Sequence, residues 1–278
     1  LKQAVAAGAR LSSEIELVFE LAAAPITGIT GSDGKTTTTT LISEMLQADG
    51  RQVFLGGNIG RSLIEDVLTI PSTAEIVLEL SSFQLMTLAI SPQAVVMTNL
   101  SPNHLDYHVD FDEYVQVKTN VLRWQNTNDV AVLNWDNELT KNLTNLTKGR
   151  VHYFSRQTDV ANGAYLRDGQ IVLRVAGEAE TLCATDELKL LGDHNVEKVM
   201  AAAIVARAKG VGLDAIRQVA TTFSGVEHRL EFVRELHGVL YYNDSIASSP
   251  TRTNAGLAAL PFPVVLIAGG YDKQIPFE

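Results

Sequence analysis

Residues 31–34 form a glycine-rich turn that is followed directly by Lys35 and Thr36. These residue types can hold a nucleotide phosphate. Glycines let backbone N–H groups converge on phosphate oxygens, a lysine amine reaches the outer phosphates, and a threonine hydroxyl binds Mg²⁺. The strict phosphate-loop (P-loop) pattern has glycine five residues before Gly34, where this chain has Ile29, so the match is imperfect. The residues expected to contact the nucleotide are Gly31, Ser32, Asp33, Gly34, Lys35, Thr36 and Thr37.

The segments on both sides of this turn provide the context that such a loop needs. Residues 25–30 are apolar and predict a buried strand, and apolar side chains at helical spacing predict a helix that ends near Gly50. The alternative is an ordinary glycine-rich turn between a strand and a helix. The order of strand, turn, Lys-Thr and helix favours nucleotide binding.

Two further side chains could bind metal ions. Glu79 lies near the end of an otherwise apolar segment at 75–80 that predicts a strand, and a buried carboxylate is costly unless it meets a cation or a donor. Glu79 is therefore either a solvent-facing strand end or a magnesium ligand, since Mg²⁺ prefers oxygen ligands. His104 lies in a polar loop and is either structural or part of a second metal site.

Lys118 lies on a predicted helix at 111–124 and has apolar residues one turn away on both sides. Its stem either extends along this apolar face towards solvent, or its amine is partly buried and has a lowered pKa. A neutral amine can react with CO₂ to form a carbamate, which would make Lys118 an anionic oxygen ligand for magnesium. The neighbours one turn away are Tyr114, Val115, Val121 and Leu122.

Strands and helices alternate over the first half of the chain, which predicts an α/β fold with a mostly parallel sheet covered on both faces. Ligands of such sheets bind at the carboxyl ends of the strands. We therefore expect four polar loops to meet at that edge, namely 31–36, Asn58, Glu79 and 104–106. The expected strands are 25–30, 51–55, 75–80, 94–98 and 130–134, the expected helices are 13–22, 35–50, 62–68, 111–124 and 137–146, and 56–60 is an expected loop.

The second half of the chain changes character twice. Residues 151–192 predict short strands joined by turns, and hence a small antiparallel addition. After helices that begin at His194 and near Asp214, strand and helix signals start again at Val226. The expected elements there are strands at 229–235, 239–243 and 263–268 and a helix at 251–260, which is the start of a Rossmann-like C-terminal domain.

The composition is that of a globular protein and argues against several classes. The 278 residues are 46% hydrophobic and 19% charged, and a net charge of −10 without a long basic run argues against a nucleic-acid-binding surface. Cys183 is the only cysteine, which rules out an internal disulfide and suits a reducing cytoplasm. No apolar run approaches the roughly 20 residues of a membrane-spanning helix, and no signal peptide is visible. We expect a cytoplasmic monomer that binds neither nucleic acid nor membranes.

Several motifs follow one another along the chain: GITGSDGKTTTT, GGNIG, ELSSFQL, NHLDYH, Tyr114-x-x-x-Lys118, LGDHN, EHRLE, NDSIASSPTRT and GGYDK. Taken together, these motifs resemble those of the Mur ligase family, in that family's order. The resemblance implies an ATP-dependent ligase of peptidoglycan precursor synthesis with two Mg²⁺ sites. Such an enzyme phosphorylates the carboxylate of UDP-N-acetylmuramoyl-L-alanine, and the amine of D-glutamate then attacks the acyl phosphate. The alternatives are another ligase of this type, folylpolyglutamate synthase, or a nucleotide-binding module without ligation.

The resemblance also implies roles for individual residues. The implied catalytic residues are Lys35, Glu79, His104 and Lys118. One Mg²⁺ would be bound by Thr36 and Glu79, and the second by His104 and carbamylated Lys118. The implied ATP contacts beyond the P-loop are Asn195, Arg229 and Asp244, and the implied substrate contacts are Asn58, Ser81 and Lys273. Lys273 would meet a carboxylate of D-glutamate.

Three parts are expected along the chain. They are the tail of an N-terminal UDP-substrate domain at 1–24, a central ATP-binding domain at 25–226 and the beginning of a truncated C-terminal amino-acid-binding domain at 227–278. We therefore expect the chain alone to bind ATP weakly and not to ligate. Three positions depart from the family's usual pattern: Asp33 and Lys198 stand where asparagine is frequent, and Ile246 where some relatives have lysine.

Overall fold

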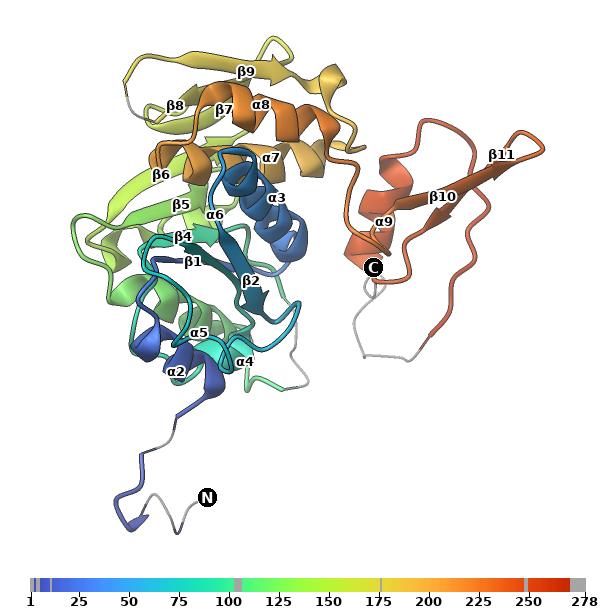
Figure 1. Cartoon of the computed structure of the whole chain (residues 1–278). Coiled ribbons are helices and arrows are strands. Elements are labelled where there is room, and N and C mark those ends of the chain that lie inside the picture. Colours follow the sequence, from blue (N-terminus) through green and yellow to red (C-terminus); the bar gives the residue numbers. More distant parts are fainter. Residues whose placement is uncertain are drawn as a thin grey trace.

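A mostly parallel sheet forms the centre of the chain (Figure 1). The computed structural model describes residues 3, 6–10, 12–102, 107–175, 177–247 and 250–270. Within these residues the sheet contains β1 (Ile26–Thr30), β2 (Val53–Gly57), β3 (Glu75–Glu79), β4 (Ala94–Met97), β5 (Val130–Asn134), β6 (Arg150–Ser155), β7 (Gly163–Arg167), β8 (Gln170–Arg174) and β9 (Glu180–Ala184). The order is β2-β3-β1-β4-β5-β6-β7-β8-β9. Neighbours from β2 to β7 are parallel, whereas β8 and β9 pair antiparallel, so the predicted α/β class is confirmed.

Helices cover both faces of this sheet (Figure 1). They are α2 (Glu14–Leu21), α3 (Lys35–Ala48), α4 (Ser82–Leu85), α5 (Phe111–Arg123), α6 (Glu138–Lys141), α7 (Asp193–Ala208) and α8 (Leu213–Thr222). On one face α3, α7 and α8 bury Leu41, Met200 and Ile216 against the strands. On the other face α2 and α5 bury Val18 and Val121. Among the described residues, no helix combines the length and apolar character that crossing a membrane requires.

β1 lies between β3 and β4, and all five of its residues are buried. Ile29 is in register with Glu79 on one side and with Val96 on the other, so the three strands end at the same edge. The turn at 31–34 therefore lies between the end of β3 and the residues that follow β4, as the alternation of strands and helices predicts.

The glycine-rich segment 56–60, which its composition predicts to be a loop, is a loop only in part. Gly56 and Gly57 belong to β2. Gly57 is in register with Glu79 and has a φ of 90°. A Cβ at Gly57 would lie 2.2 Å from the Glu79 carbonyl oxygen. Glycine therefore continues the strand here because it permits an approach to β3 that a side chain would block.

The two expected helices at 62–68 and 137–146 are not formed as continuous helices. Residues 63–70 make consecutive turns, in which the Asp66 amide donates to the Leu63 carbonyl at 3.1 Å. A helix this short offers few bonds to offset the cost of nucleation. The segment at 137–146 divides into α6 and a 3₁₀ turn, Leu143–Leu146.

The expected antiparallel addition at 151–192 is smaller than predicted. β6 is parallel to β5, and β7 is parallel to β6. The segment that contains α6 connects β5 to β6, and such a crossover makes the two strands parallel. The segment ELKLLG at 187–192, the last strand expected in this region, forms no strand in the described structure: a 3₁₀ turn, Thr185–Glu187, ends at its first residue, and 188–192 are irregular.

After α8 the chain forms an antiparallel hairpin of β10 (Glu231–Leu236) and β11 (Val239–Asn243), followed by α9 (Pro250–Ala258). These elements lie apart from the nine-stranded sheet (Figure 1). The expected strand at 263–268 is wrong: the described residues show no strand there, and Val265 is 92% exposed. A strand forms only where a neighbouring strand accepts its backbone hydrogen bonds.

His152 of β6 should make the fold sensitive to acid. Burial lowers the pKa of His152 to about 4, against about 6.5 in an unfolded chain. Below pH 6.5 His152 therefore binds a proton in the unfolded chain but stays neutral in the folded chain until the pH approaches 4. Up to about 3 kcal/mol of the free energy of unfolding is lost between pH 6.5 and 4. We expect denaturant unfolding of His152→Leu to depend less on pH over this range than that of the wild type.

The matched control is His237→Asn, in the exposed turn between β10 and β11. His237 has a φ of 52°, a conformation that asparagine also adopts. This variant should keep the acid sensitivity of the wild type. Equal acid sensitivity of His152→Leu and the wild type would contradict the assignment.

Candidate active site

The turn between β1 and α3 is shaped by two glycines and ordered by its own lysine. Gly31 has a φ of 140° and Gly34 a φ of 82°. A Cβ at Gly31 would lie 1.9 Å from the Thr98 hydroxyl oxygen, so only glycine fits there. The Lys35 amine donates to the carbonyls of Gly31 at 2.9 Å and Ser32 at 3.0 Å. Burial lowers the pKa of Lys35 to about 8, although nearby Glu79 opposes this shift.

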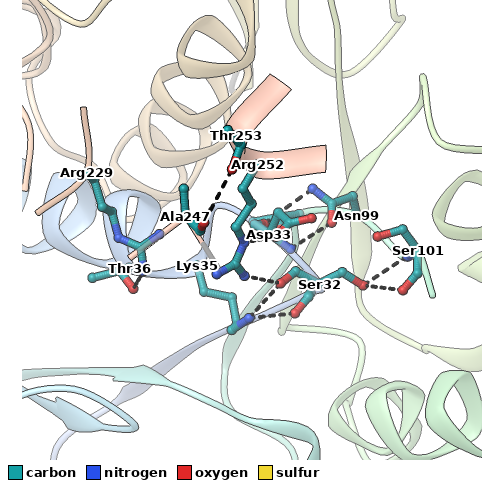
Figure 2. A network of polar contacts seen from close by, with 12 residues as sticks. Ser32, Asp33, Lys35, Thr36, Asn99, Ser101, Arg229, Ala247, Arg252 and Thr253 are labelled. Carbon is teal, nitrogen blue, oxygen red and sulfur yellow. Dashed lines mark hydrogen bonds and ion pairs between the residues drawn. The ribbon is translucent and has the colours of Figure 1, made fainter. Parts of the chain in front are cut away.

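The residues after β4 hold the other side of the turn (Figure 2). The Asn99 side-chain oxygen accepts the Asp33 amide at 2.9 Å, and the Thr98 hydroxyl donates to the Asp33 carbonyl at 2.6 Å. The Ser32 hydroxyl donates to the Ser101 carbonyl at 2.9 Å. The amino end of α3 and its turn therefore form a fixed cradle, with the positive end of the helix dipole facing it. Sequence reasoning gave Thr98 and Asn99 no role, although both are polar residues directly after a buried strand.

Thr36 and Glu79 meet at the start of α3. The Thr36 hydroxyl donates to Glu79 Oε2 at 2.6 Å, and Asn58 Nδ2 donates to Glu79 Oε1 at 2.9 Å. Glu79 is 2% exposed. A buried carboxylate beside a hydroxyl, at the edge of a phosphate cradle, fits the oxygen ligands that Mg²⁺ takes. Sets of three or more His, Cys, Asp or Glu side chains that could hold a metal are absent from the residues that the structure describes.

Lys118 is buried rather than extended towards solvent. Its side chain lies on α5 and is 1% exposed, and its amine donates to the Thr30 hydroxyl at 3.2 Å. The amine also lies 5.0 Å from the centre of the Tyr114 ring. Burial, helped by the positive charge of Lys35, lowers the pKa of Lys118 well below its usual value. A lower pKa favours the neutral form of the amine, which is the form that reacts with CO₂.

These groups line a pocket of about 200 Å³ at the carboxyl edge of the sheet. Its walls include Lys35, Thr36, Asn58, Glu79, Ser81 and Lys118. The Ser81 hydroxyl also caps α4 by accepting the Gln84 amide at 3.3 Å. A second cavity of about 260 Å³ is lined on one side by α7 and on the other by the segment after α8. Gly34, Arg229 and Arg252 line both cavities, which therefore adjoin above the P-loop.

The larger cavity contains the other predicted ATP contacts. Asn195 Nδ2 donates to the Leu191 carbonyl at 2.6 Å, and the Lys198 amine donates to Asn195 Oδ1 at 2.7 Å. Burial lowers the pKa of Lys198 to about 8. Asp244 accepts the Leu230 amide at 2.9 Å, and burial raises the pKa of Asp244.

Two arginines from beyond α8 approach the P-loop (Figure 2). Arg229 Nη2 donates to the Thr36 hydroxyl at 2.7 Å. Arg252 pairs with the Asp33 carboxylate. Arg229 is one of the ATP contacts that the family resemblance implies, whereas the resemblance implies no role for Arg252. Two other predicted site residues, His104 and Lys273, lie outside the described residues.

A phosphate cradle, a carboxylate–hydroxyl pair and a buried lysine at one sheet edge suit an enzyme that transfers phosphoryl groups. The chain belongs to the Mur ligase family, since the family's middle-domain model, "Mur ligase middle domain", matches residues 29–206. This membership confirms the resemblance that the motifs indicate.

Two relatives carry a more specific name. The UDP-N-acetylmuramoylalanine–D-glutamate ligase of Clostridium novyi (strain NT) is 50% identical over 278 residues, which are 100% of this chain and 60% of that protein. The ligase of the same name from Acetivibrio thermocellus (strain ATCC 27405) is 52% identical over 272 residues, which are 98% of this chain and 58% of that protein. The chain thus spans less than two thirds of the length of these curated relatives.

Solved structures agree on the fold. MurF from Acinetobacter baumannii is similar with a TM-score of 0.68 at 18% identity, covering 86% of this chain and 54% of that chain. A UDP-N-acetylmuramoyl-L-alanyl-D-glutamate–2,6-diaminopimelate ligase has a TM-score of 0.65 at 22% identity, covering 85% of this chain and 53% of that chain. At such identities the similarity concerns the fold alone.

Proposed function

We propose that this chain provides the ATP-binding part of a ligase that joins D-glutamate to UDP-N-acetylmuramoyl-L-alanine in peptidoglycan precursor synthesis. One observation carries the proposal: the P-loop lysine, the Thr36–Glu79 pair and the buried Lys118 line a single pocket. Identity of about half to ligases of that name over nearly the whole chain supports the choice of substrates. Because the reaction uses ATP, we place it in the cytoplasm, and we propose a monomer.

Each part of the proposed site has a task. Lys35 and the P-loop amides hold the outer phosphates of ATP, while Asn195, Arg229 and Asp244 hold the rest of the nucleotide. Thr36 and Glu79 would bind one Mg²⁺, and His104 with carbamylated Lys118 a second. Magnesium at these positions neutralises the charge that collects when a carboxylate meets the γ-phosphate. The proposed substrate contacts are Asn58 and Ser81 for the muramoyl substrate and Lys273 for D-glutamate.

The reaction needs alignment and charge neutralisation more than covalent chemistry by the protein. The substrate carboxylate attacks the γ-phosphorus, which gives an acyl phosphate and ADP. The amine of D-glutamate then attacks the acyl carbon, and the tetrahedral intermediate expels phosphate. ATP contacts come from the proposed central domain at 25–226 and from 227–278, so closure of the second part over the first would complete the site. The proposed role of residues 1–24 is to lead in from a UDP-substrate domain.

The test is a ligation assay with the gene product that carries this chain, ATP, Mg²⁺ and UDP-N-acetylmuramoyl-L-alanine. We expect ADP release to require D-glutamate and to be at least about a hundredfold slower with L-lysine or meso-diaminopimelate, because unpaired polar groups in a specific pocket are costly. Faster turnover with either of these, or with a folate, would assign the chain to another ligase. ATP binding without ligation of any of them would make it a nucleotide-binding module.

A further inference from the structure

We propose that Arg252 is a phosphate-binding residue of this site, which exchanges the Asp33 carboxylate for a β- or γ-phosphate oxygen when ATP binds. The inference rests on the proposed nucleotide-binding function and adds to it a cation from α9. Arg252 lies in the motif NDSIASSPTRT, but the family resemblance implies no role for it.

The position of Arg252 carries the argument. The residue lies 219 positions after Asp33 in the chain, and its guanidinium nevertheless contacts the P-loop. Its Nε donates to Asp33 Oδ1, and its Nη2 donates to the Ser32 carbonyl at 3.2 Å (Figure 2). Arg252 lines both cavities. A ligand that extends from one cavity into the other must therefore pass this guanidinium.

The two arginines approach the loop at different residues. Arg229 contacts Thr36, at the first turn of α3, whereas Arg252 contacts Ser32 and Asp33, before the helix begins. A phosphate chain held at the amino end of α3 would therefore have a guanidinium near each of these positions. A guanidinium has five N–H donors in a planar fork and binds phosphate through two of them at once.

The stability of α9 does not explain this arginine. Arg252 is the third residue of a helix that begins at Pro250. The partial positive charge of a helix amino end disfavours a cation in the first turn. Asp33 is itself unfavourable in a loop that binds phosphate, because its carboxylate repels the ligand. Pairing with Arg252 neutralises that carboxylate, and a phosphate brings more negative charge to the same guanidinium.

The competing explanation is that Arg252 only ties α9 to the loop through Asp33. A double-mutant cycle separates the two explanations. We would titrate the chain with MgATP, MgADP and adenosine by calorimetry, using the wild type, Arg252→Ala, Asp33→Asn and the double variant. Lys35→Ala serves as a control that loses phosphate binding. Arg234→Ala is the matched arginine control, because Arg234 lies on β10 and stacks on the Tyr241 ring.

We expect Arg252→Ala to weaken MgATP binding about tenfold in both the wild-type and the Asp33→Asn background, a loss of about 1.4 kcal/mol. Binding of adenosine should stay unchanged, and Arg234→Ala should bind MgATP as the wild type does. Arg252→Lys keeps the positive charge but lacks the planar set of guanidinium donors, so we expect an intermediate loss of MgATP affinity. Thermal unfolding of each variant checks the fold, and Arg252→Lys replaces Arg252→Ala in the cycle if the alanine variant does not fold.

A loss that disappears in the Asp33→Asn background would overturn the proposal, because Arg252 would then act only through Asp33. An equal loss for adenosine would overturn it too, since the effect would concern the shape of the pocket. If the wild type bound adenosine and MgATP with equal affinity, and Lys35→Ala bound MgATP as the wild type does, the proposed nucleotide phosphate site as a whole would be overturned. If the wild type preferred MgATP to adenosine but Arg252→Ala bound MgATP with the same affinity as the wild type, only the inference about Arg252 would be overturned.

Discussion

Lys118→Met should lower the rate of ligation by at least about a thousandfold, the scale of losing a charged group aimed at the reacting atoms. Methionine fills a similar volume but cannot form a carbamate. The fold should be at least as stable as that of the wild type, because the variant no longer buries an amine in an apolar environment. Thr30 keeps a partner, since its hydroxyl donates to the Leu80 carbonyl at 2.8 Å. Thermal unfolding and the ligation assay measure the two effects separately.

The carbamate itself has a direct readout. Wild-type protein equilibrated with ¹³C-bicarbonate should show a protein-bound carbamate signal by ¹³C NMR that Lys118→Met lacks. The matched control is Lys141→Met, because Lys141 lies over the Trp135 ring, is partly exposed and lines neither cavity. It should keep both the signal and the activity. Normal ligation by Lys118→Met would show that the lysine is not a ligand of the reacting site.

Glu79→Gln should raise the Mg²⁺ concentration needed for half-maximal ligation by at least about tenfold and lower the maximal rate by about a hundredfold. Glutamine keeps the shape, and its amide oxygen can still accept from Asn58, but its NH₂ group only donates and replaces the oxygen that accepts from Thr36. Glutamine also lacks the charge that a divalent cation requires. Magnesium titration of ADP release measures both changes. The result would place the carboxylate beside the ion rather than in a purely structural pair with Thr36.

Glu75→Gln provides the control on the same strand. Glu75 is buried at the opposite end of β3 and pairs with Arg51 and Lys209. Its substitution should lower thermal stability, because Lys209 loses its acidic partner and Arg51 keeps only Asp49. The magnesium dependence of the folded protein should stay that of the wild type. If Glu75→Gln and Glu79→Gln shifted the magnesium titration equally, the metal assignment to Glu79 would be wrong.

The central strands and the place of the P-loop could be predicted because their signals are local. An apolar run ends in a glycine turn, and parallel strands bring their polar ends to one edge by geometry alone. The strand at Gly56 and Gly57 could not be predicted, because its cause is the approach of β3 rather than the propensity of glycine. The expected strand at 263–268 failed for the same kind of reason, since apolar composition does not supply a neighbouring strand.

The site shows the same division between local and distant causes. Lys35, Glu79 and Lys118 stand out in the sequence because each is a polar residue in an unusual local setting. The contacts of Asn99 and Arg252 with the P-loop join segments that are far apart in the chain, and no local pattern encodes such pairing. The one local signal for Arg252 is a cation in the first turn of a helix, where the dipole opposes it.

All residues of α7 from Val199 to Ala206 are buried, so over two turns this helix has no face towards water. Such a segment cannot open by local fluctuation, and its opening free energy approaches that of the whole domain. Asn195 and Lys198 lie at the amino end of α7, directly before this buried segment. Arg229 and Arg252 instead adjoin a two-stranded hairpin with exposed apolar side chains. We therefore expect the wall that carries Arg229 and Arg252 to open more readily than the wall that carries Asn195 and Lys198.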